Sequence, residues 1–236
     1  AHRTNAWVTS LGTKHGIRKK FKGEIMKAML KTLSAAVAMT GAATVPVVSH
    51  ADVSYNVGFV SEYYYRGFFQ KSSSASAGID FEEGGFYAGA WTADVGEGLE
   101  VDGYLGYGVE MGDLSASVGF TGYYYTGSFD DTYEEVNLNF GYGPLSLEYS
   151  VGTYDGSFSE TEVLQDYTFT GLSADLGAGF SATYGSFGSD AAGAYFQADY
   201  GFSVAELDFG ISLIFPDDDI ATEDGEAIVF SVGKSF

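Results

Sequence analysis

The sequence predicts an all-β fold, a transmembrane antiparallel up-and-down β-barrel of about 12 strands. Three observations predict it. Apolar residues alternate with small or polar residues in segment after segment, an export signal precedes these segments, and the connectors between them alternate between short and long. Bacterial outer-membrane barrels combine these features, because each strand presents one face to lipid and the other to the lumen.

The export signal is predicted at residues 26–51. Lys27 and Lys31 form a short basic region, residues 30–48 are mostly apolar and carry no charge apart from Lys31, and residues 49–51 form a small-x-small cleavage site. We therefore expect cleavage before Asp52. A retained transmembrane helix needs about 20 apolar residues and is disfavoured, because a glycine and a proline interrupt this stretch.

Residues 1–25 fit neither the signal nor the barrel, since they are basic and mixed in character. The run at residues 22–24 can be encoded by a purine-rich, ribosome-binding type of sequence just before Met26. We interpret residues 1–25 as upstream sequence that is not native to the protein. The mature domain is then expected to span residues 52–236.

Removal of the leader makes the chain strongly acidic. Eight of the 11 Lys and Arg residues precede Asp52, whereas 31 of the 32 acidic residues follow it, so three basic residues oppose 31 acidic ones, for a formal charge of −28. The remaining bases are Arg66, Lys71 and Lys234. Nucleic acid is excluded as a partner, because binding to phosphates requires Lys and Arg.

The mature chain also lacks the residues of common catalytic sites. All three histidines precede Asp52 and the chain has no cysteine. Ser-His-Asp and Cys-His nucleophile systems, Cys or His zinc sites and disulfides are therefore excluded. Paired carboxylates could still act as in glycosidases, but close pairs arise by chance among so many acids. We predict no enzyme activity, no cofactor and no metal site.

Twelve strands are predicted from the period-two pattern and the Gly, Asp, Ser and Pro residues between segments. In chain order they span 53–65, 74–82, 86–94, 100–110, 114–124, 132–142, 145–154, 165–174, 179–187, 192–202, 206–215 and 226–236. The faces of 86–94 and 165–174 are ambiguous, and a bulge there could shift the register by one residue. Ten and fourteen strands remain open alternatives.

The apolar rows of the clearest strands are expected to face lipid. The first strands show Val53, Tyr55, Val57 and Phe59, then Ala75, Ala77, Ile79 and Phe81. The middle strands show Leu114, Ala116, Val118 and Phe120, then Val136, Leu138, Phe140 and Tyr142. The last two show Leu207, Phe209, Ile211, Leu213 and Phe215, then Ile228, Phe230, Val232 and Phe236. We expect the aromatic end of the last strand, at Phe236, to be read by the outer-membrane assembly machinery.

The connectors alternate in length along the chain. The short ones are 83–85, 111–113, 143–144, 175–178 and 203–205, and the longer ones are 66–73, 95–99, 125–131, 155–164 and 216–225. Short periplasmic turns and longer external loops are typical of outer-membrane barrels, and an even strand count returns both ends of the barrel to the periplasmic side.

A soluble β-sandwich also alternates and also has glycine-rich turns. It would bury its aromatic residues in a core between two sheets. Here the aromatic residues gather near strand ends, where a girdle at the lipid–water boundary would lie: Tyr63, Tyr65, Tyr124, Tyr142, Phe202 and Phe236. The barrel is therefore favoured.

Several runs resemble a known family. They are SEYYYRGFFQ at residues 61–70, Gly-Ile-Asp at 78–80, GGFYAGAW at 84–91, Leu-Glu-Val-Asp at 99–102 and Gly-Tyr at 106–107. They are similar to the opening half of the TorF-type porin family of proteobacteria. The resemblance covers the first part of the mature chain, and beyond Tyr107 only the strand rhythm and the terminal Phe236 continue it. It implies an outer-membrane barrel that acts as a porin.

The residues opposite the apolar rows are expected to line the lumen. They include the acids Glu62, Asp80, Asp102, Glu135, Glu148, Asp199 and Asp208, with Arg66 as the one inward base. Unpaired carboxylates are costly in a dry interior, so the lumen should be wet or neutralised by cations. An acid-lined wet barrel concentrates cations. The alternative is a midsection filled by Tyr104, Tyr123, Tyr133 and Tyr195, since twelve strands lie between filled and open barrels.

Arg66 is expected at the mouth, where the first long loop begins. It could steer solutes at a constriction, or it could form a salt bridge with Glu62 or Asp80 that ties the first hairpin. The salt bridge is favoured, because a lone base among acids finds a partner.

The acidic run near the last strand has two interpretations. Oxygen ligands of this kind bind Ca²⁺ or Mg²⁺, but the run lacks the ligand spacing and central glycine of an EF-hand loop. A solvated, self-repelling loop is favoured. The run comprises Asp217, Asp218, Asp219, Glu223, Asp224 and Glu226.

The function predicted from the sequence is an outer-membrane porin that passively conducts small hydrophilic solutes and prefers cations. The alternative is a non-conducting structural or adhesive barrel. The expected partners are outer-membrane lipid, lipopolysaccharide and the solutes themselves. The sequence leaves the oligomeric state open.

Overall fold

The computed structural model describes residues 51–156, 164–221 and 225–236. The expectations for residues 1–50, for the centre of the 155–164 loop, and for Glu223 and Asp224 lie outside the described residues. No helix within the described ranges is long and apolar enough to cross a membrane.

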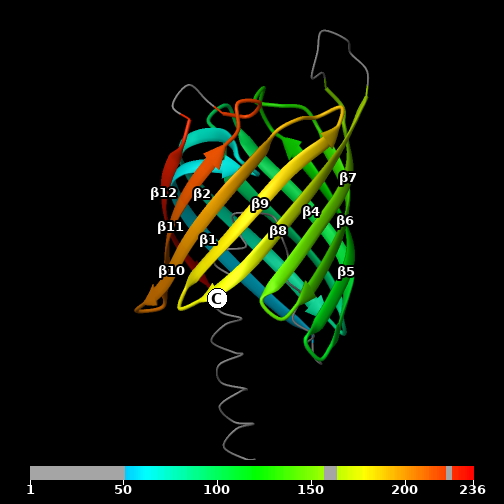
Figure 1. Ribbon diagram of the computed structural model, residues 1–236, viewed down its shortest axis with the longest axis vertical. Helices are drawn as coiled ribbons and strands as arrows, with labels where there is room; N and C mark the ends of the chain where they lie inside the picture. The colour runs from blue at the N-terminus through cyan, green and yellow to red at the C-terminus, as the bar shows by residue number, and fades with distance from the viewer. Residues whose placement is uncertain (1–50, 157–163, 222–224) are drawn as a thin grey trace, which may run out of the picture.

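Twelve antiparallel strands form one closed barrel, as predicted (Figure 1). Each strand pairs with its neighbours in sequence, and β1 pairs with β12 to close the ring. In chain order the strands are β1 Asp52–Tyr65, β2 Phe68–Glu83, β3 Phe86–Asp94, β4 Leu99–Met111, β5 Leu114–Tyr125, β6 Tyr133–Tyr142, β7 Leu145–Tyr154, β8 Gln165–Gly177, β9 Phe180–Ser189, β10 Ala194–Val204, β11 Leu207–Pro216 and β12 Ala227–Ser235.

The outer face of the barrel is apolar, because the period-two pattern directs alternate side chains outward. Val57, Val118 and Leu213 are between 38 and 50% exposed, whereas their neighbours in sequence point inward. Near the ends of this face Tyr124, Tyr142, Phe202 and Phe236 are also exposed. A soluble sandwich would bury such rows between two sheets, so the exposure of the whole apolar face supports a lipid-facing barrel.

The five connectors at the end of the barrel that holds the C-terminus are tight turns (Figure 1). Two residues separate the flanking strands in each, as in Gly84–Gly85 and Ala205–Glu206. Both residues of these two turns have positive φ, between 51° and 92°, which is the backbone conformation of tight hairpin turns between twisted strands. Four-residue and longer connectors gather at the opposite end, which we call the loop end.

The first connector of the loop end differs from the prediction. Residues 66–73 are not a long loop: Arg66 and Gly67 alone form the turn, with φ of 46° and 87°, and β2 already begins at Phe68. Residues 68–72 instead pair with β1, for example Tyr64 with Phe69 and Glu62 with Ser72. The polar, serine-rich sequence resembles a loop, but cross-strand pairing with β1 overrides that local preference.

The upper part of this hairpin, residues 61–75, leaves the barrel wall and enters the lumen; we call it the inward hairpin. β1 pairs with β12 only up to Val60, and β2 pairs with β3 only from Ser76 onward, while β1 and β2 stay paired with each other up to the turn. In Figure 1 the cyan ends of β1 and β2 arch over at the loop end. The predicted girdle positions Tyr63 and Tyr65 are therefore wrong, because both rings lie inside the barrel.

Register irregularities occur at two places in the described barrel. One lies at Tyr63 and Tyr64, where the inward hairpin bends, and the other lies between Asp175 and Gly177 in β8. The pairing of β3 is regular throughout, so the ambiguity expected for 86–94 is resolved without a bulge. The irregularity of β8 lies just beyond the predicted 165–174 segment.

Candidate functional site

A buried ion cluster joins the tip of the inward hairpin to the opposite wall. The Arg66 guanidinium donates from Nη1 to Glu135 Oε1 at 2.5 Å and from Nη2 to Glu135 Oε2 at 3.1 Å. The same Nη2 donates to Glu148 Oε1 at 2.5 Å and to Ser150 Oγ at 3.3 Å. Arg66 is 3% exposed and Glu135 is 2% exposed. A bidentate guanidinium–carboxylate pair fixes both distance and orientation, so the cluster holds the hairpin across the lumen.

Aromatic side chains surround this cluster. The guanidinium carbon of Arg66 lies 4.1 Å from the Phe169 ring centroid and 5.0 Å from that of Tyr65. The Tyr65 hydroxyl donates to the Tyr123 hydroxyl at 2.7 Å, and the Tyr167 hydroxyl donates to Glu135 at 2.8 Å. Cation–π contact is strongest where the charge is shielded from water. These rings therefore stabilise Arg66 in the interior.

Two further buried acids, Glu100 and Asp102, lie on β4 next to the inward hairpin. The Tyr63 hydroxyl lies 3.0 Å from both carboxylate oxygens of Glu100, which is 1% exposed. Asp102 is 8% exposed, and its Oδ1 has no hydrogen-bond partner within the described residues. Glu100 and Asp102 have no basic partner among the described ion pairs. The interior therefore has more buried carboxylates than the single guanidinium can balance.

The remaining predicted acids are spread around the inner face. Asp80 accepts hydrogen bonds from Tyr104 and from Asn56, the latter at 3.2 Å. Asp199 accepts from Ser212 at 2.6 Å and from Gln197 at 2.8 Å. Asp208 accepts from Ser203 at 2.5 Å near a tight turn. All three side chains are half-buried or nearly so, and each lies away from the Arg66 cluster.

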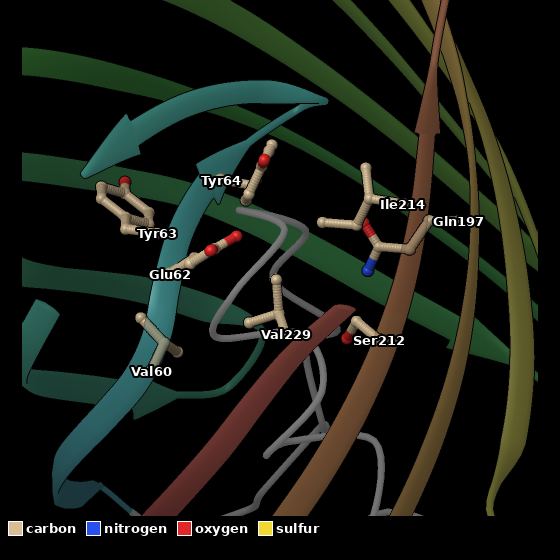
Figure 2. Close-up of a pocket in the computed structure, with 8 residues that line it drawn as sticks. All are labelled: Val60, Glu62, Tyr63, Tyr64, Gln197, Ser212, Ile214 and Val229. Atoms are coloured by element: carbon tan, nitrogen blue, oxygen red, sulfur yellow. The ribbon is translucent and has the colours of Figure 1, made fainter. Parts of the chain in front are cut away.

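Glu62 faces a small cavity between the departing β1 strand and the inner face of β10, β11 and β12 (Figure 2). The cavity has a volume of about 20 Å³. Val60, Tyr64, Ile214 and Val229 form its apolar part, and Gln197 and Ser212 supply polar groups. It is large enough for little more than one water molecule. We therefore interpret it as a gap left by the bend of β1 and not as a solute-binding site.

Several inward glycines do not widen the lumen, because aromatic side chains fill the space that a Cβ would occupy. A Cβ added to Gly106 would lie 2.4 Å from the Tyr87 ring, one added to Gly119 would lie 2.3 Å from the Tyr87 hydroxyl oxygen, and one added to Gly185 would lie 2.3 Å from the Tyr195 ring. In the structure these residues make space for rings that pack against the wall.

Buried side chains gather in the loop-end half of the lumen, whereas most inward residues near the tight turns stay partly exposed, with the buried Tyr87 as an exception. Phe169, Tyr195 and Ile220 form one buried cluster with Phe68 and Phe187 packed against it. Tyr63, Ala93 and Val95 form another beside β3. Inward residues nearer the tight turns, such as Asn56, Ser117 and Asn139, stay partly exposed. Of the predicted plug residues, Tyr123 and Tyr195 lie in the loop-end half, together with the partly buried Tyr133, and Tyr104 lies over Gly89.

Arg66 forms ion pairs, as predicted, but its partners differ from the predicted ones. Arg66 pairs with Glu135 and Glu148 rather than with Glu62 or Asp80, because the hairpin turns inward and spans the barrel. Glu100, Tyr65 and Phe169 were missed as members of the site. The inward alternation of Glu100 with Asp102 was visible in the sequence, whereas nothing in the alternation of β1 indicates that its end leaves the wall.

No group of three or more acidic, histidine or cysteine side chains is placed to hold a metal ion within the described ranges. Asp217 instead accepts backbone hydrogen bonds from Ala194 at 2.8 Å and Asp219 at 3.2 Å, so part of the acidic run folds its own loop.

Comparison with solved structures supports the membrane-barrel fold. A structure solved in work on the in-meso crystallization of membrane proteins aligns with a TM-score of 0.51 at 9% identity, over 79% of this chain and 83% of that one. OccK1 of Pseudomonas aeruginosa aligns at 12% identity with a TM-score of 0.36, over 71% of this chain and 57% of its own. OprD of the same organism aligns at 12% identity with a TM-score of 0.37, over 78% and 66%. This chain thus spans less than two thirds of the length of OccK1 and OprD.

Sequence comparison gives a family but no described activity. No curated protein matches the chain. A family model described as a bacterial protein of unknown function, Gcw_chp, matches residues 44–201, which is more than half of the chain. An all-β, closed, twelve-stranded barrel with an apolar outer face is thus the fold of this sequence, and the chain belongs to the Gcw_chp family of bacterial proteins.

Proposed function

We propose that this protein is an outer-membrane porin of TorF type that conducts small hydrophilic solutes passively and prefers cations. Residues 26–51 would act as the export signal, and the apolar outer face would contact outer-membrane lipid. The tight turns would lie on the periplasmic side, since bacterial barrels have short turns there.

One observation supports the proposal most directly: the polarity of the inner face. Asp80, Asp199 and Asp208 line the inner face, Glu100 and Asp102 are buried beside the inward hairpin, and Arg66 is the one buried base among the described residues. A structural barrel has no need of buried carboxylates that lack a counter-charge, because each is costly to desolvate. Carboxylates along a wet path raise the local cation concentration.

The filled loop-end half favours a second candidate, a non-conducting barrel. The Arg66 cluster and the ring clusters close the lumen in the described conformation. If this conformation is permanent, the barrel has a structural or adhesive role, with its acidic loops outside. The two candidates differ in one property, the permeability of the lumen.

Solute flux into proteoliposomes separates the two candidates. Full-length chain would be expressed, and the processed protein would be purified from outer membranes and reconstituted beside protein-free liposomes. The porin proposal expects tetramethylammonium to enter faster than methanesulfonate, a compact anion of a strong acid. Liposomes as impermeable as the protein-free control would favour the structural barrel, and faster anion entry would contradict cation preference.

A further inference from the structure

We propose that the inward hairpin, residues 61–75, has a second position in the barrel wall, where it completes the edge of β12 and opens the lumen. The proposal rests on the proposed conducting function, because it assigns the regulation of the same lumen. It follows from three features of the described residues: an incomplete wall, a matching register and an ion cluster that holds the hairpin inside.

The wall is incomplete beside β12. Pairing between β1 and β12 stops at Val60 and Ser231, although β12 continues to Ala227. Above that point the backbone N–H of Phe230 donates to the Ser61 side chain at 2.9 Å rather than to a strand. Four residues of β12, about 13 Å of strand, thus lack a wall partner on one side. Unpaired backbone groups are costly next to lipid, and open sheet edges are avoided there.

The register already in place matches the missing partner to residues of the inward hairpin. Continuing the Val60–Ser231 pairing would place Ser61 opposite Phe230, Glu62 opposite Val229 and Tyr63 opposite Ile228. The alternation of β1 would then point Tyr63 and Tyr65 outward, at the level of the strand ends. That is the girdle arrangement typical of membrane barrels, so the same sequence suits the wall as well as the lumen.

The hinge is built into the hairpin. The positive φ of 55° at Ser73, which lies opposite Ser61, and the register irregularity between Tyr63 and Tyr64, two residues nearer the tip, let the two strands bend within this short stretch. The hairpin base contacts β12 through Val60 and Tyr64, which pack on the buried Ala227 and Val229, and the small cavity of about 20 Å³ lies beside this contact (Figure 2). Bulges re-aim strands in this manner.

The two positions are stabilised by different contacts. Inside, the Arg66 ion pairs with Glu135 and Glu148 hold the tip, and the Tyr63 hydroxyl contacts Glu100. In the wall, four further residue pairs of the β1–β12 ladder would form. Movement outward would take Arg66, the one buried base among the described residues, away from Glu135 and Glu148, and would uncover these carboxylates and Glu100. Opening would therefore make the lumen wider and more negative in one step.

Paired cysteines test the wall position, because the chain has no native cysteine. In the described position Tyr63 is 6% exposed and packs inside near Trp91, whereas Ile228 is 59% exposed on the outer face. A short bis-methanethiosulfonate reagent should join Tyr63→Cys to Ile228→Cys only when the hairpin lies in the wall. Tyr63→Cys with Val232→Cys is the matched control, since Val232 pairs with Phe59, four residues away from Tyr63.

A second pair holds the hairpin inside. Tyr65 and Tyr123 have ring centroids 5.5 Å apart in the described position. Bridging Tyr65→Cys to Tyr123→Cys with a reagent of matching length should prevent movement to the wall. Glu135→Gln, which removes the bidentate partner of Arg66, should increase Tyr63–Ile228 cross-linking about tenfold or more, the shift expected from a loss of about 1.4 kcal/mol.

Each outcome has a distinct meaning when cross-linking and planar-bilayer conductance are measured on the same proteins. We expect Tyr63–Ile228 cross-linking with raised conductance, and loss of conductance in the Tyr65–Tyr123 bridged protein. Conductance with no Tyr63–Ile228 cross-link beyond the Val232 control overturns the wall position and leaves the porin function standing. A cross-link without any conductance supports the wall position and overturns the porin function.

Discussion

The guanidinium of Arg66 and the carboxylate of Glu135 lie face to face in the interior of the barrel, 69 residues apart in sequence, with their closest atoms 2.5 Å apart. Arg66 is at the tip of the first hairpin, and Glu135 is on β6, on the far side of the ring. This ion pair therefore connects the tip of the inward hairpin to the opposite wall of the barrel.

Glu135→Gln should destabilise the barrel, because it leaves the buried Arg66 guanidinium with Glu148 as its remaining charged partner. We expect a loss on the order of 3 kcal/mol in the free energy of unfolding, as when one member of a buried pair is removed. Urea unfolding in lipid vesicles measures it. Glu110→Gln is the control, since Glu110 is exposed near a tight turn and should change stability little.

Gly185→Ala should strain the inner wall. Its Cβ would lie 2.3 Å from the Tyr195 ring, which is itself packed against Phe169 and Ile220. Overpacking of this kind costs about 1–3 kcal/mol. Gly103→Ala provides the comparison, because no heavy atom lies within 4 Å of its added Cβ. Equal stability of the two variants would show that the ring does not cover Gly185.

Val118→Arg should destabilise the barrel in the membrane, because it places a charge on the lipid-facing surface. Val118 is 50% exposed on the outer surface, and an arginine near the bilayer midplane costs about 2–4 kcal/mol. Ser117→Arg, one residue away on the inner face, should be milder because its side chain can reach water. Unfolding of both variants in vesicles is the measurement, and a reversed order would contradict the assignment of faces. Ser212 would be a poor inward control, since it is 4% exposed and bonded to Asp199.

The barrel itself could be predicted from the sequence because a lipid-facing strand imposes a period of two on nearly every residue. Ile211, Leu213 and Phe215 show this clearly, and both predicted and observed strands contain them. The inward hairpin could not be predicted in this way. Tyr63 and Tyr65 keep the period of the wall, and only contacts with Glu100 and Tyr123, distant in sequence, place them inside.

The carboxylates on the inner face near the tight turns should account for part of the cation preference. Asp80→Asn together with Asp208→Asn removes two negative charges while keeping side-chain size and one acceptor oxygen at each position. We expect the ratio of tetramethylammonium to methanesulfonate flux to fall, while the protein stays folded. Glu206→Gln is the control, because Glu206 lies in a tight turn, outside the lumen-facing rows, and pairs with Lys234. A flux ratio that is the same in all variants would mean that these acids do not line the path.

The reversal potential of the wild-type protein in a planar bilayer tests the central claim most directly. Under a tenfold KCl gradient, the carboxylate-lined lumen should give a potential with the sign of K⁺ diffusion. Its magnitude should shrink when the same gradient is applied at higher salt, because the Debye length falls from about 10 Å at 0.1 M to about 3 Å at 1 M. A potential with the sign of Cl⁻ diffusion, or a bilayer that stays non-conducting, would contradict the account.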